Sequence, residues 1–337
     1  MVPLVRRYAI LNGVMDDDKD MRRVHNGSIP RLGGVGIYLA FYLPFLGFLF
    51  YQNRISRFLF LDIRQFLGLL ICSTLILGLG IYDDIKGANA GKKLTVQTIA
   101  AIILCFFGFG IERISNPFGS PIHLGWLSLP ITVFWLVGLS NAFNLIDGID
   151  GLASGVAFFA TSSLLAVALF LGNTLPSLFT AALAGATLGF LRYNFNPAKI
   201  FMGDSGSLFL GFTIAAISIH GSQKAHAVMA ILIPIVALGL PIIDTLLAIA
   251  RRLYRGLPIP TADREHIHHK LIQYGFSHRR TALVLYGFCI VLSAVAVLLT
   301  ISSTILVGVI LAFLGLFIFW WVKKYKIYGR IYPEEGK

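Results

Sequence analysis

The chain is dominated by apolar stretches of roughly the length that an α-helix needs to cross a bilayer, about 20 residues. Their approximate ranges are 33–51, 66–82, 95–111, 126–143, 152–172, 175–191, 205–220, 226–250, 281–301 and 303–322. A mean hydropathy of +0.78 with 13% charged residues is untypical of water-soluble domains. We therefore predict an all-α, polytopic integral membrane bundle of about ten transmembrane helices, embedded in a lipid bilayer.

The positive charges are distributed unevenly between alternate loops. The net charge is +12, and the large majority of the 28 Lys and Arg residues lie in residues 1–32, in every second loop after them, and from residue 323 onward. Lys and Arg mark the cytoplasmic side of a membrane protein. We therefore predict a cytoplasmic N-terminal segment (1–32), a transmembrane catalytic domain (33–322) and a cytoplasmic tail (323–337). The same pattern explains the basic composition as membrane topology and argues against nucleic-acid binding.

Five carboxylates adjoin the apolar stretches, and all of them fall on the side predicted to be cytoplasmic. They form three separate motifs, which are Asp83 with Asp84, Asp147 with Asp150, and Asp204. An ionisable group at a membrane span costs roughly 2.5–3.5 kcal/mol on insertion scales, so it usually serves a function. Because each motif also contains Gly or Asn, the three together suggest a site for a metal ion and phosphates.

The pair Asp83-Asp84 closes one predicted span and opens a basic loop that contains Lys92 and Lys93. Adjacent carboxylates at a helix end point in different directions, so one can bind a metal ion while the other accepts a proton. Nearby ammonium groups favour the ionised carboxylates and attract an anionic substrate. A purely structural pair would be poorly placed, because acidic residues at a helix C-terminus oppose the macrodipole. We therefore favour a functional pair.

Polar residues recur at every third position in the second motif. Asn141, Asn144 and Asp147 can share one helical face, and Gly148 and Gly151 allow the backbone to approach a ligand closely. The loop contains no Lys or Arg, so its acidic residues would pair with a cation or with donors of a base or a sugar. An EF-hand calcium loop is the alternative, but the motif supplies too few ligands for one.

The third motif is a polar loop, running from Asn194 to Ser207, that leads into a predicted span. Asp204 or Ser205 can cap the helix that follows, and free N–H groups at a helix start favour phosphate. Asp204 is the candidate Mg²⁺ ligand, because the motifs supply carboxylates and no cysteine. Phe201 could stack on a base, although an aromatic residue at a membrane boundary is more often an anchor.

The longest cytoplasmic loop contains His266, His268 and His269 between Arg264 and Lys270. The spacing differs from that of the HExxH zinc motif, and no nearby cysteine completes a zinc site. We interpret the three imidazoles as contacts for phosphate oxygens, with a solvated loop and a zinc site as the alternatives.

Asp244 lies inside the predicted span 226–250 rather than at its end. Buried carboxylates are usually paired with a cation. We interpret Asp244 as a structural residue that pairs with Arg251 or Arg252 near the end of the same stretch.

Five stretches occur in an order that is typical of one enzyme family. They are Arg23–Gly34, Asp83–Asp84, Asn144–Gly151, Asn196–Asp204 and His266–His269. Each stretch alone is moderately specific, whereas the ordered set is very specific. The chain thus resembles the polyprenyl-phosphate N-acetylhexosamine-1-phosphate transferases, which include the phospho-MurNAc-pentapeptide translocase. The spaced form of the histidine motif is most similar to the branch that uses UDP-GlcNAc.

The resemblance implies an enzyme of the bacterial cell membrane whose site faces the cytoplasm and requires Mg²⁺. A polyprenyl phosphate such as undecaprenyl phosphate would attack the β-phosphate of a UDP-N-acetylhexosamine, giving a lipid-diphosphate sugar and UMP. By resemblance, Asp83 accepts the lipid phosphate proton, Asp84 helps to position the reactants, and Asp204 binds the metal, with Asp147 as a further ligand. The residues that match the substrate pocket are Lys93, Asn144, Asp147, Asp150, Asn194, Phe201, His266, His268 and His269. Within this set, Phe201 would stack on uracil, and Lys93 and the histidines would hold the diphosphate.

Several alternatives stay open at this level. A phospho-MurNAc-pentapeptide transferase is the alternative within the family, and a zinc hydrolase that uses the histidines is another class of enzyme. A secondary transporter would bind coupling ions near mid-bilayer, whereas these acidic residues lie at helix ends. Relatives usually have one more span before the first loop, and residues 1–7 resemble the end of that helix. A homodimer is compatible with the resemblance.

Overall fold

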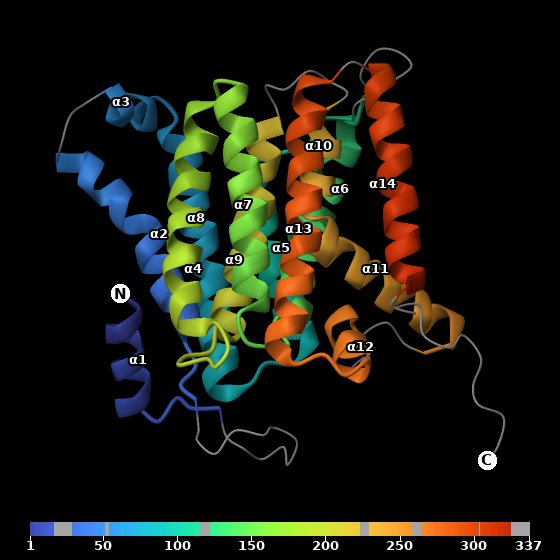
Figure 1. Cartoon of the computed structure of the whole chain (residues 1–337). Helices are drawn as coiled ribbons and strands as arrows, with labels where there is room; N and C mark the ends of the chain where they lie inside the picture. Colours follow the sequence, from blue (N-terminus) through green and yellow to red (C-terminus); the bar gives the residue numbers. More distant parts are fainter. Residues whose placement is uncertain are drawn as a thin grey trace, which may run out of the picture.

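The structure is a computed structural model that describes residues 1–16, 29–50, 54–114, 122–222, 229–257, 265–302 and 304–324. Helices make up most of the described residues (Figure 1). In chain order they are α1 (Val2–Leu11), α2 (Gly33–Phe50), α3 (Arg54–Leu61), α4 (Ile63–Lys86), α5 (Ala90–Phe106), α6 (Ser128–Ile146), α7 (Leu152–Phe170), α8 (Thr174–Asn194), α9 (Gly203–Ser222), α10 (Met229–Ala237), α11 (Gly239–Tyr254), α12 (Ile267–Gln273), α13 (His278–Ile301) and α14 (Thr304–Lys324). A short antiparallel ribbon of β1 (Arg113–Ile114) and β2 (Ile122–His123) joins α5 to the 3₁₀ turn Gly125–Leu127 before α6. The predicted all-α fold is confirmed.

The predicted spans correspond to helices of the structure. Within the described residues, 6 helical segments are long and apolar enough to cross a membrane, namely Ile63–Lys86, Gly125–Ile146, Leu152–Phe170, Thr174–Asn194, His278–Ile301 and Leu306–Lys324. The predicted spans 33–51, 95–111 and 205–220 coincide with α2, α5 and α9. The chain is therefore a multi-pass membrane protein.

One predicted span differs from the structure. The stretch 226–250 is not a continuous helix, because α10 ends at Ala237 and α11 begins at Gly239. Pro234 and Pro241 flank this break, and proline removes a helical hydrogen bond and disfavours helix in the residue before it. α11 consequently runs obliquely to the rest of the bundle (Figure 1).

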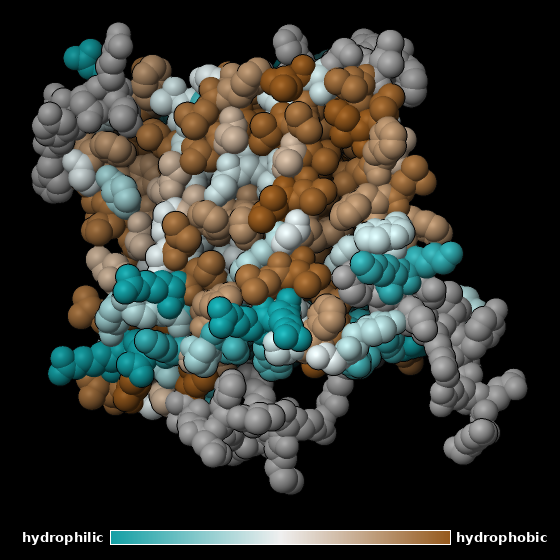
Figure 2. Space-filling model, in the orientation of Figure 1, coloured by the Kyte–Doolittle hydropathy of each residue, from teal (hydrophilic) through white to brown (hydrophobic). Residues whose placement is uncertain are grey.

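Apolar and hydrophilic side chains separate on the surface of the molecule. Figure 2 shows a broad apolar area over the upper helices and a band of hydrophilic residues near the lower edge of the view. This band lies at the level of α1 and α12 in Figure 1. The separation is that expected of a bundle with an apolar belt in the membrane and a polar end outside it.

Helix α9 is the centre of the bundle. It packs against α2, α4, α6, α7, α8 and α10, and residues 205–219 are all buried. A helix that is apolar on all sides is typical of such a buried position. The polar first turn of α9 therefore lies where the ends of several neighbouring helices meet.

Glycines bring two of these neighbours into backbone contact with the start of α9. A Cβ atom added at Gly34 of α2 would lie 2.1 Å from the backbone nitrogen of Gly206, and one added at Gly80 of α4 would lie 2.4 Å from the Cα of Ser205. Small residues allow membrane helices to approach this closely. The contacts fix the Asp83-Asp84 end of α4 beside the start of α9.

This close contact predicts a position-specific effect within α4. We expect Gly80→Ala to destabilise the protein by about 1–3 kcal/mol, because the added methyl group must push α4 away from α9. Gly78→Ala is the matched control, since no atom lies within 4 Å of the methyl group that it adds. Thermal unfolding in detergent should show a lower Tm for Gly80→Ala alone. Equal Tm values for the two variants would contradict the contact.

Candidate active site

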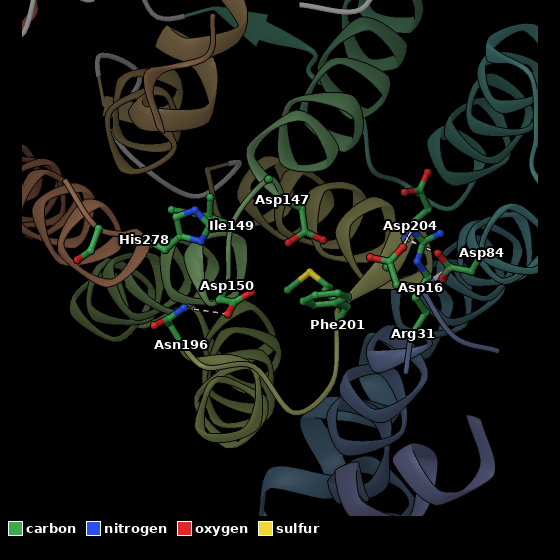
Figure 3. A pocket seen from close by; sticks show the side chains of 14 residues that line it. Asp16, Arg31, Asp84, Asp147, Ile149, Asp150, Asn196, Phe201, Asp204 and His278 are labelled. Carbon is green, nitrogen blue, oxygen red and sulfur yellow. Dashed lines mark hydrogen bonds and ion pairs between the residues drawn. The ribbon is translucent and has the colours of Figure 1, made fainter. Parts of the chain in front are cut away.

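The three acidic motifs meet in one cavity of about 600 Å³. Asp84 comes from the end of α4, Asp147 and Asp150 from the loop between α6 and α7, and Asp204 from the first turn of α9. Figure 3 shows Asp147 and Phe201 in the middle, with Asp150 on one side and Asp84 and Asp204 on the other. Four of the five predicted carboxylates therefore lie together, whereas Asp83 is not among the described residues that line the cavity. The volume is within the usual range for small-molecule sites, roughly 300–1,000 Å³.

Lys93 links two of the acidic motifs. Its ammonium group forms ion pairs with the carboxylates of Asp83 on α4 and Asp204 on α9. All three side chains are partly exposed, so a ligand can reach them. Asn144 lies beside this group and donates to the hydroxyl of Ser207, one turn after Asp204, over 3.0 Å. The arrangement joins a candidate proton acceptor, a cation and a metal-ligand candidate in one cluster, of which Asp204 lines the cavity.

The donor chemistry of this cluster fits a magnesium ion. The carboxylates of Asp83 and Asp204 both form ion pairs with the ammonium group of Lys93, so they already bind one positive charge between them. Within the described ranges, no group of three or more His, Cys, Asp or Glu side chains is arranged to hold a metal ion. Mg²⁺ suits such an open site, because it is usually bound by one or two carboxylates together with water and substrate phosphates.

Asp84 has a different task from Asp83, since its carboxylate caps helix α9. Its two oxygens accept hydrogen bonds from the backbone N–H groups of Asp204 (2.8 Å) and Ser205 (3.0 Å). A Cβ at Gly203 would lie 2.5 Å from this carboxylate, and Gly203 has a φ of +70°, which favours glycine. The predicted cap from Asp204 or Ser205 is wrong, because a residue 120 positions away in the sequence supplies it.

The loop between α8 and α9 is tied to the loop between α6 and α7. The side chain of Asn194 accepts hydrogen bonds from the Gly151 N–H (3.2 Å) and the Ser154 hydroxyl (2.8 Å) and donates to the carbonyl of Ile200 (3.0 Å). Asn194 is buried and is not among the described residues that line the cavity. Asn194 therefore supports the two loops, whereas the resemblance implies that it lies in the substrate pocket.

Asp150 lines the cavity while it also holds the α8–α9 loop. One of its oxygens accepts hydrogen bonds from the Asn196 side chain (3.0 Å) and from the backbone N–H of Ala198 (3.1 Å). The first of these bonds is drawn in Figure 3. The carboxylate is almost fully buried, with 7% of its residue exposed. Asp150 is therefore oriented by the loop that carries Phe201.

Phe201 is fixed through its backbone, and its ring lines the cavity. Its N–H donates to the carbonyl of Pro30 (2.9 Å), and its carbonyl accepts from Gly33 (3.0 Å). The segment before α2 thus runs alongside the segment before α9. The ring lies between the acidic groups of the two sides of the cavity (Figure 3), where a planar base could stack on it.

Several lining residues have no role in the predicted site, among them Asp16, Arg31, Ser277 and His278. Asp16 and Arg31 form an ion pair at the cavity, and Ser277 and His278 line it from the start of α13. Arg31 lies in the first stretch that resembles the family, and that is the signal that could have found it. Asp16 opens the run Asp16-Asp17-Asp18, which belongs to none of these stretches. The part of the first family stretch before residue 29 lies outside the described residues.

The histidine motif forms the start of α12 beside the cavity. His268 is buried, and a Cβ at Gly148 would lie 2.2 Å from its Nε2, so the ring covers the backbone of the α6–α7 loop. Within the described residues, neither ring nitrogen of His268 has a hydrogen-bond partner. Burial lowers the pKa of His268 to about 3, so this ring is neutral near pH 7. An unpaired buried imidazole next to Gly148 is suited to a ligand that supplies the missing bond.

His269 packs against His268 with ring centroids 4.1 Å apart, and His266 forms a hydrogen bond from Nδ1 to Asp244 (2.8 Å). Asp244 is buried, as expected of a structural residue. However, the hydrogen bonds of its carboxylate go to His266 and to the backbone of Ile267, in place of the predicted partners Arg251 and Arg252.

The fold and the site define a multi-pass membrane transferase, and comparison with known proteins agrees. The profile of glycosyl transferase family 4 matches residues 66–222. A probable undecaprenyl-phosphate N-acetylglucosaminyl 1-phosphate transferase of Bacillus subtilis is 39% identical over 93% of this chain and 85% of its own length. A decaprenyl-phosphate N-acetylglucosaminephosphotransferase of Mycobacterium tuberculosis is 35% identical over 79% of this chain and 70% of its own length. A phospho-N-acetylmuramoyl-pentapeptide-transferase of Listeria monocytogenes is 32% identical over 89% of this chain and 92% of its own length.

The chain belongs to glycosyl transferase family 4. The predicted resemblance is therefore confirmed, both for the family and for its similarity to N-acetylglucosamine 1-phosphate transferases.

The capping role of Asp84 predicts an effect on stability. We expect Asp84→Ala to lower the stability by about 1–2 kcal/mol, because two backbone N–H groups of α9 lose their acceptor. Asp84→Asn keeps one acceptor oxygen and should lose less. Asp62→Ala is the control, since Asp62 stands at the N-cap of α4 without a side-chain capping bond. Thermal unfolding in detergent measures all three, and an unchanged Tm for Asp84→Ala would contradict the capping role.

Proposed function

We propose that this chain transfers N-acetylglucosamine 1-phosphate from UDP-GlcNAc to undecaprenyl phosphate, giving lipid-diphosphate-GlcNAc and UMP. The observation that carries the proposal is the cluster of Asp83, Lys93 and Asp204, which joins three helices and reaches the cavity through Asp204. The names of the similar transferases from Bacillus subtilis and Mycobacterium tuberculosis support the sugar and the polyprenyl acceptor.

The donor would occupy the cavity with its uracil against Phe201. Asp147 and Asp150 line the cavity beside this ring and can accept hydrogen bonds from the base or the ribose. Base–aromatic stacking gives affinity, and the carboxylates orient the nucleoside. The diphosphate then extends toward the positive charge of Lys93 and the histidines of α12.

The transfer itself requires two phosphate groups to approach each other. An oxygen of the lipid phosphate forms a bond to the β-phosphorus of the donor, and the bond from that phosphorus to the bridging oxygen breaks. The electron pair leaves with UMP. Asp83 accepts the proton of the lipid phosphate, and Lys93 turns from the carboxylates to the diphosphate. Bound Mg²⁺, held by Asp204 with Asp147, would supply the charge neutralisation that this approach needs.

The site would face the cytoplasm, where UDP-sugars are made. The unequal distribution of Lys and Arg between alternate loops supports this orientation, with both described ends of the chain on the same side. The lipid phosphate reaches the cluster from the inner leaflet, since its chain must stay in the bilayer. The reaction would thus be the first membrane-bound step in the synthesis of a surface polysaccharide.

A donor panel tests the proposal directly. Purified protein with undecaprenyl phosphate and Mg²⁺ should release UMP from UDP-GlcNAc faster than from UDP-GalNAc, UDP-glucose or UDP-MurNAc-pentapeptide. Turnover of UDP-MurNAc-pentapeptide alone would instead assign the peptidoglycan reaction, in line with the relative from Listeria monocytogenes. Ion flux in liposomes without UMP release would instead indicate a transporter.

The metal-ligand role of Asp204 gives the first activity prediction. Asp204→Asn should reduce turnover below about one hundredth of wild type, because the amide cannot neutralise a divalent ion. The variant should still insert and keep its Tm. Asp62→Asn is the control for the same chemical change at the far end of α4. Residual activity well above this level would exclude Asp204 as an essential ligand.

The position of Phe201 predicts a change in donor binding. Phe201→Ala should raise the KM for UDP-GlcNAc roughly 5- to 150-fold while kcat changes less, because a stacked base is worth about 1–3 kcal/mol. Phe170→Ala removes an exposed phenylalanine at the end of α7 and should leave both constants unchanged. A wild-type KM for Phe201→Ala would remove the ring from the nucleotide site.

A further inference from the structure

The first turn of α13 supplies two residues to the cavity lining that no step of the reaction uses. Ser277 is the N-cap of α13, and its hydroxyl accepts a hydrogen bond from the backbone N–H of Arg280 over 3.3 Å. His278 is the first residue of the helix. Figure 3 shows His278 on the same side of the cavity as Asp150, across from Asp204. His278 therefore lines the end of the cavity away from the metal-ligand candidate.

Helix α13 is held against the loop that carries Asp150. Tyr286, two turns after His278, donates a hydrogen bond from its hydroxyl to the carbonyl of Gly151 over 2.6 Å. A Cβ at Gly155 would lie 2.2 Å from the ring of Tyr286, so this ring packs directly on α7. These contacts fix the start of α13 relative to Asp150 before a donor binds.

The proposed orientation of the donor brings one edge of uracil to this end of the cavity. The diphosphate points to Lys93 and Asp204 and the base stacks on Phe201, so the edge of the base away from the ribose faces the opposite end. That edge carries the N3–H donor and the O4 carbonyl oxygen. A carboxylate can only accept, so Asp147 or Asp150 can bond to N3–H but not to O4. The site therefore needs a hydrogen-bond donor for O4.

Few side chains around the cavity can donate. Among the described residues that line it, they are Arg31, Asn196, Ser277 and His278. Arg31 is paired with Asp16 on the other side of the cavity (Figure 3), and the amide of Asn196 donates to Asp150. Ser277 caps α13. The imidazole of His278 forms no hydrogen bond within the described part of the chain, and it carries an N–H whether it is neutral or protonated.

We propose that His278 determines the specificity for the base of the donor, and that its imidazole donates a hydrogen bond to O4 of uracil. This inference rests on the function proposed above, since it places a uridine nucleotide in the cavity. Cytosine has an amino group where uracil has O4, and a lone pair where uracil has N3–H. The imidazole N–H would then face a second donor, and the carboxylate would face the lone pair, so a cytidine nucleotide is rejected.

Binding of UDP and CDP measures this discrimination without turnover. Calorimetry in detergent with Mg²⁺ should show that the wild type binds UDP more tightly than CDP. His278→Ala should weaken UDP binding about 3- to 10-fold, the usual effect of losing one hydrogen bond, and should not weaken CDP binding. His278→Gln should retain most of the preference, because its amide can donate to O4. The same ratio of the two Kd values in the wild type and in His278→Ala would overturn the proposal.

Arg280→Ala is the matched control. Arg280 is an exposed cation in the same helical turn and is not among the described residues that line the cavity. Its loss should change the attraction for the two anionic nucleotides equally, so the ratio of their Kd values should stay that of the wild type. A fall in this ratio as large as that in His278→Ala would assign the effect to charge and contradict the hydrogen bond.

The analogue 4-thio-UDP tests the bond at the level of one atom. Sulfur is a weak hydrogen-bond acceptor, so the analogue should bind the wild type more weakly than UDP does. In His278→Ala the two nucleotides should bind about equally, because the donor is already absent. Equal losses in both proteins would place O4 away from His278. Wild-type protein that is active on UDP-GlcNAc but fails these tests refutes only the role of His278, whereas wild-type protein inactive with every donor refutes the function itself.

Discussion

The approach of α4 to the first turn of α9 is the constraint on which the rest of the site depends. Gly80 allows the two backbones to touch, and Asp84 then reaches the free N–H groups of Asp204 and Ser205. With α9 fixed in this way, the carboxylate of Asp204 is directed to Lys93 and Asp83. Loss of this contact would separate Asp204, the metal-ligand candidate, from Asp83, the candidate proton acceptor.

The opposite wall of the site is built from loops that support one another. Asn194 and Asp150 bind the α6–α7 and α8–α9 loops together through hydrogen bonds, and His268 closes over Gly148 from α12. These groups are buried and polar, so each unpaired atom would carry a cost of about 1–3 kcal/mol. The loops are consequently held in one arrangement before a donor arrives. Such preorganisation suits a reaction that consists mainly of positioning and charge neutralisation.

Much of this architecture could be predicted from the sequence, and the parts that could not share a physical cause. The apolar stretches, the order of the motifs and the meeting of Asp147, Asp204 and Asp83 follow from hydropathy, charge distribution and family resemblance. The cap of α9 by Asp84, the bonding of Asp244 to His266 and the ion pair of Asp16 with Arg31 depend on contacts between distant segments. Local patterns contain no information on such partners. The break at residue 238 is an intermediate case, because Pro234 and Pro241 are visible in the sequence although the course of α11 is not.

The two neighbouring aspartates at the end of α4 illustrate how identical residues can have different structural constraints. Asp84 must match two fixed N–H groups and lies against Gly203, so a longer side chain at this position would have no room. The carboxylate of Asp83 contacts the flexible end of Lys93, the carboxylate of Asp204 and the backbone N–H of Ala88. In the proposed reaction it must release the lysine when substrate enters. A glutamate exchange should accordingly be tolerated far better at the first position than at the second. The second aspartate of the pair therefore has the tighter steric constraint, although the first is the candidate proton acceptor.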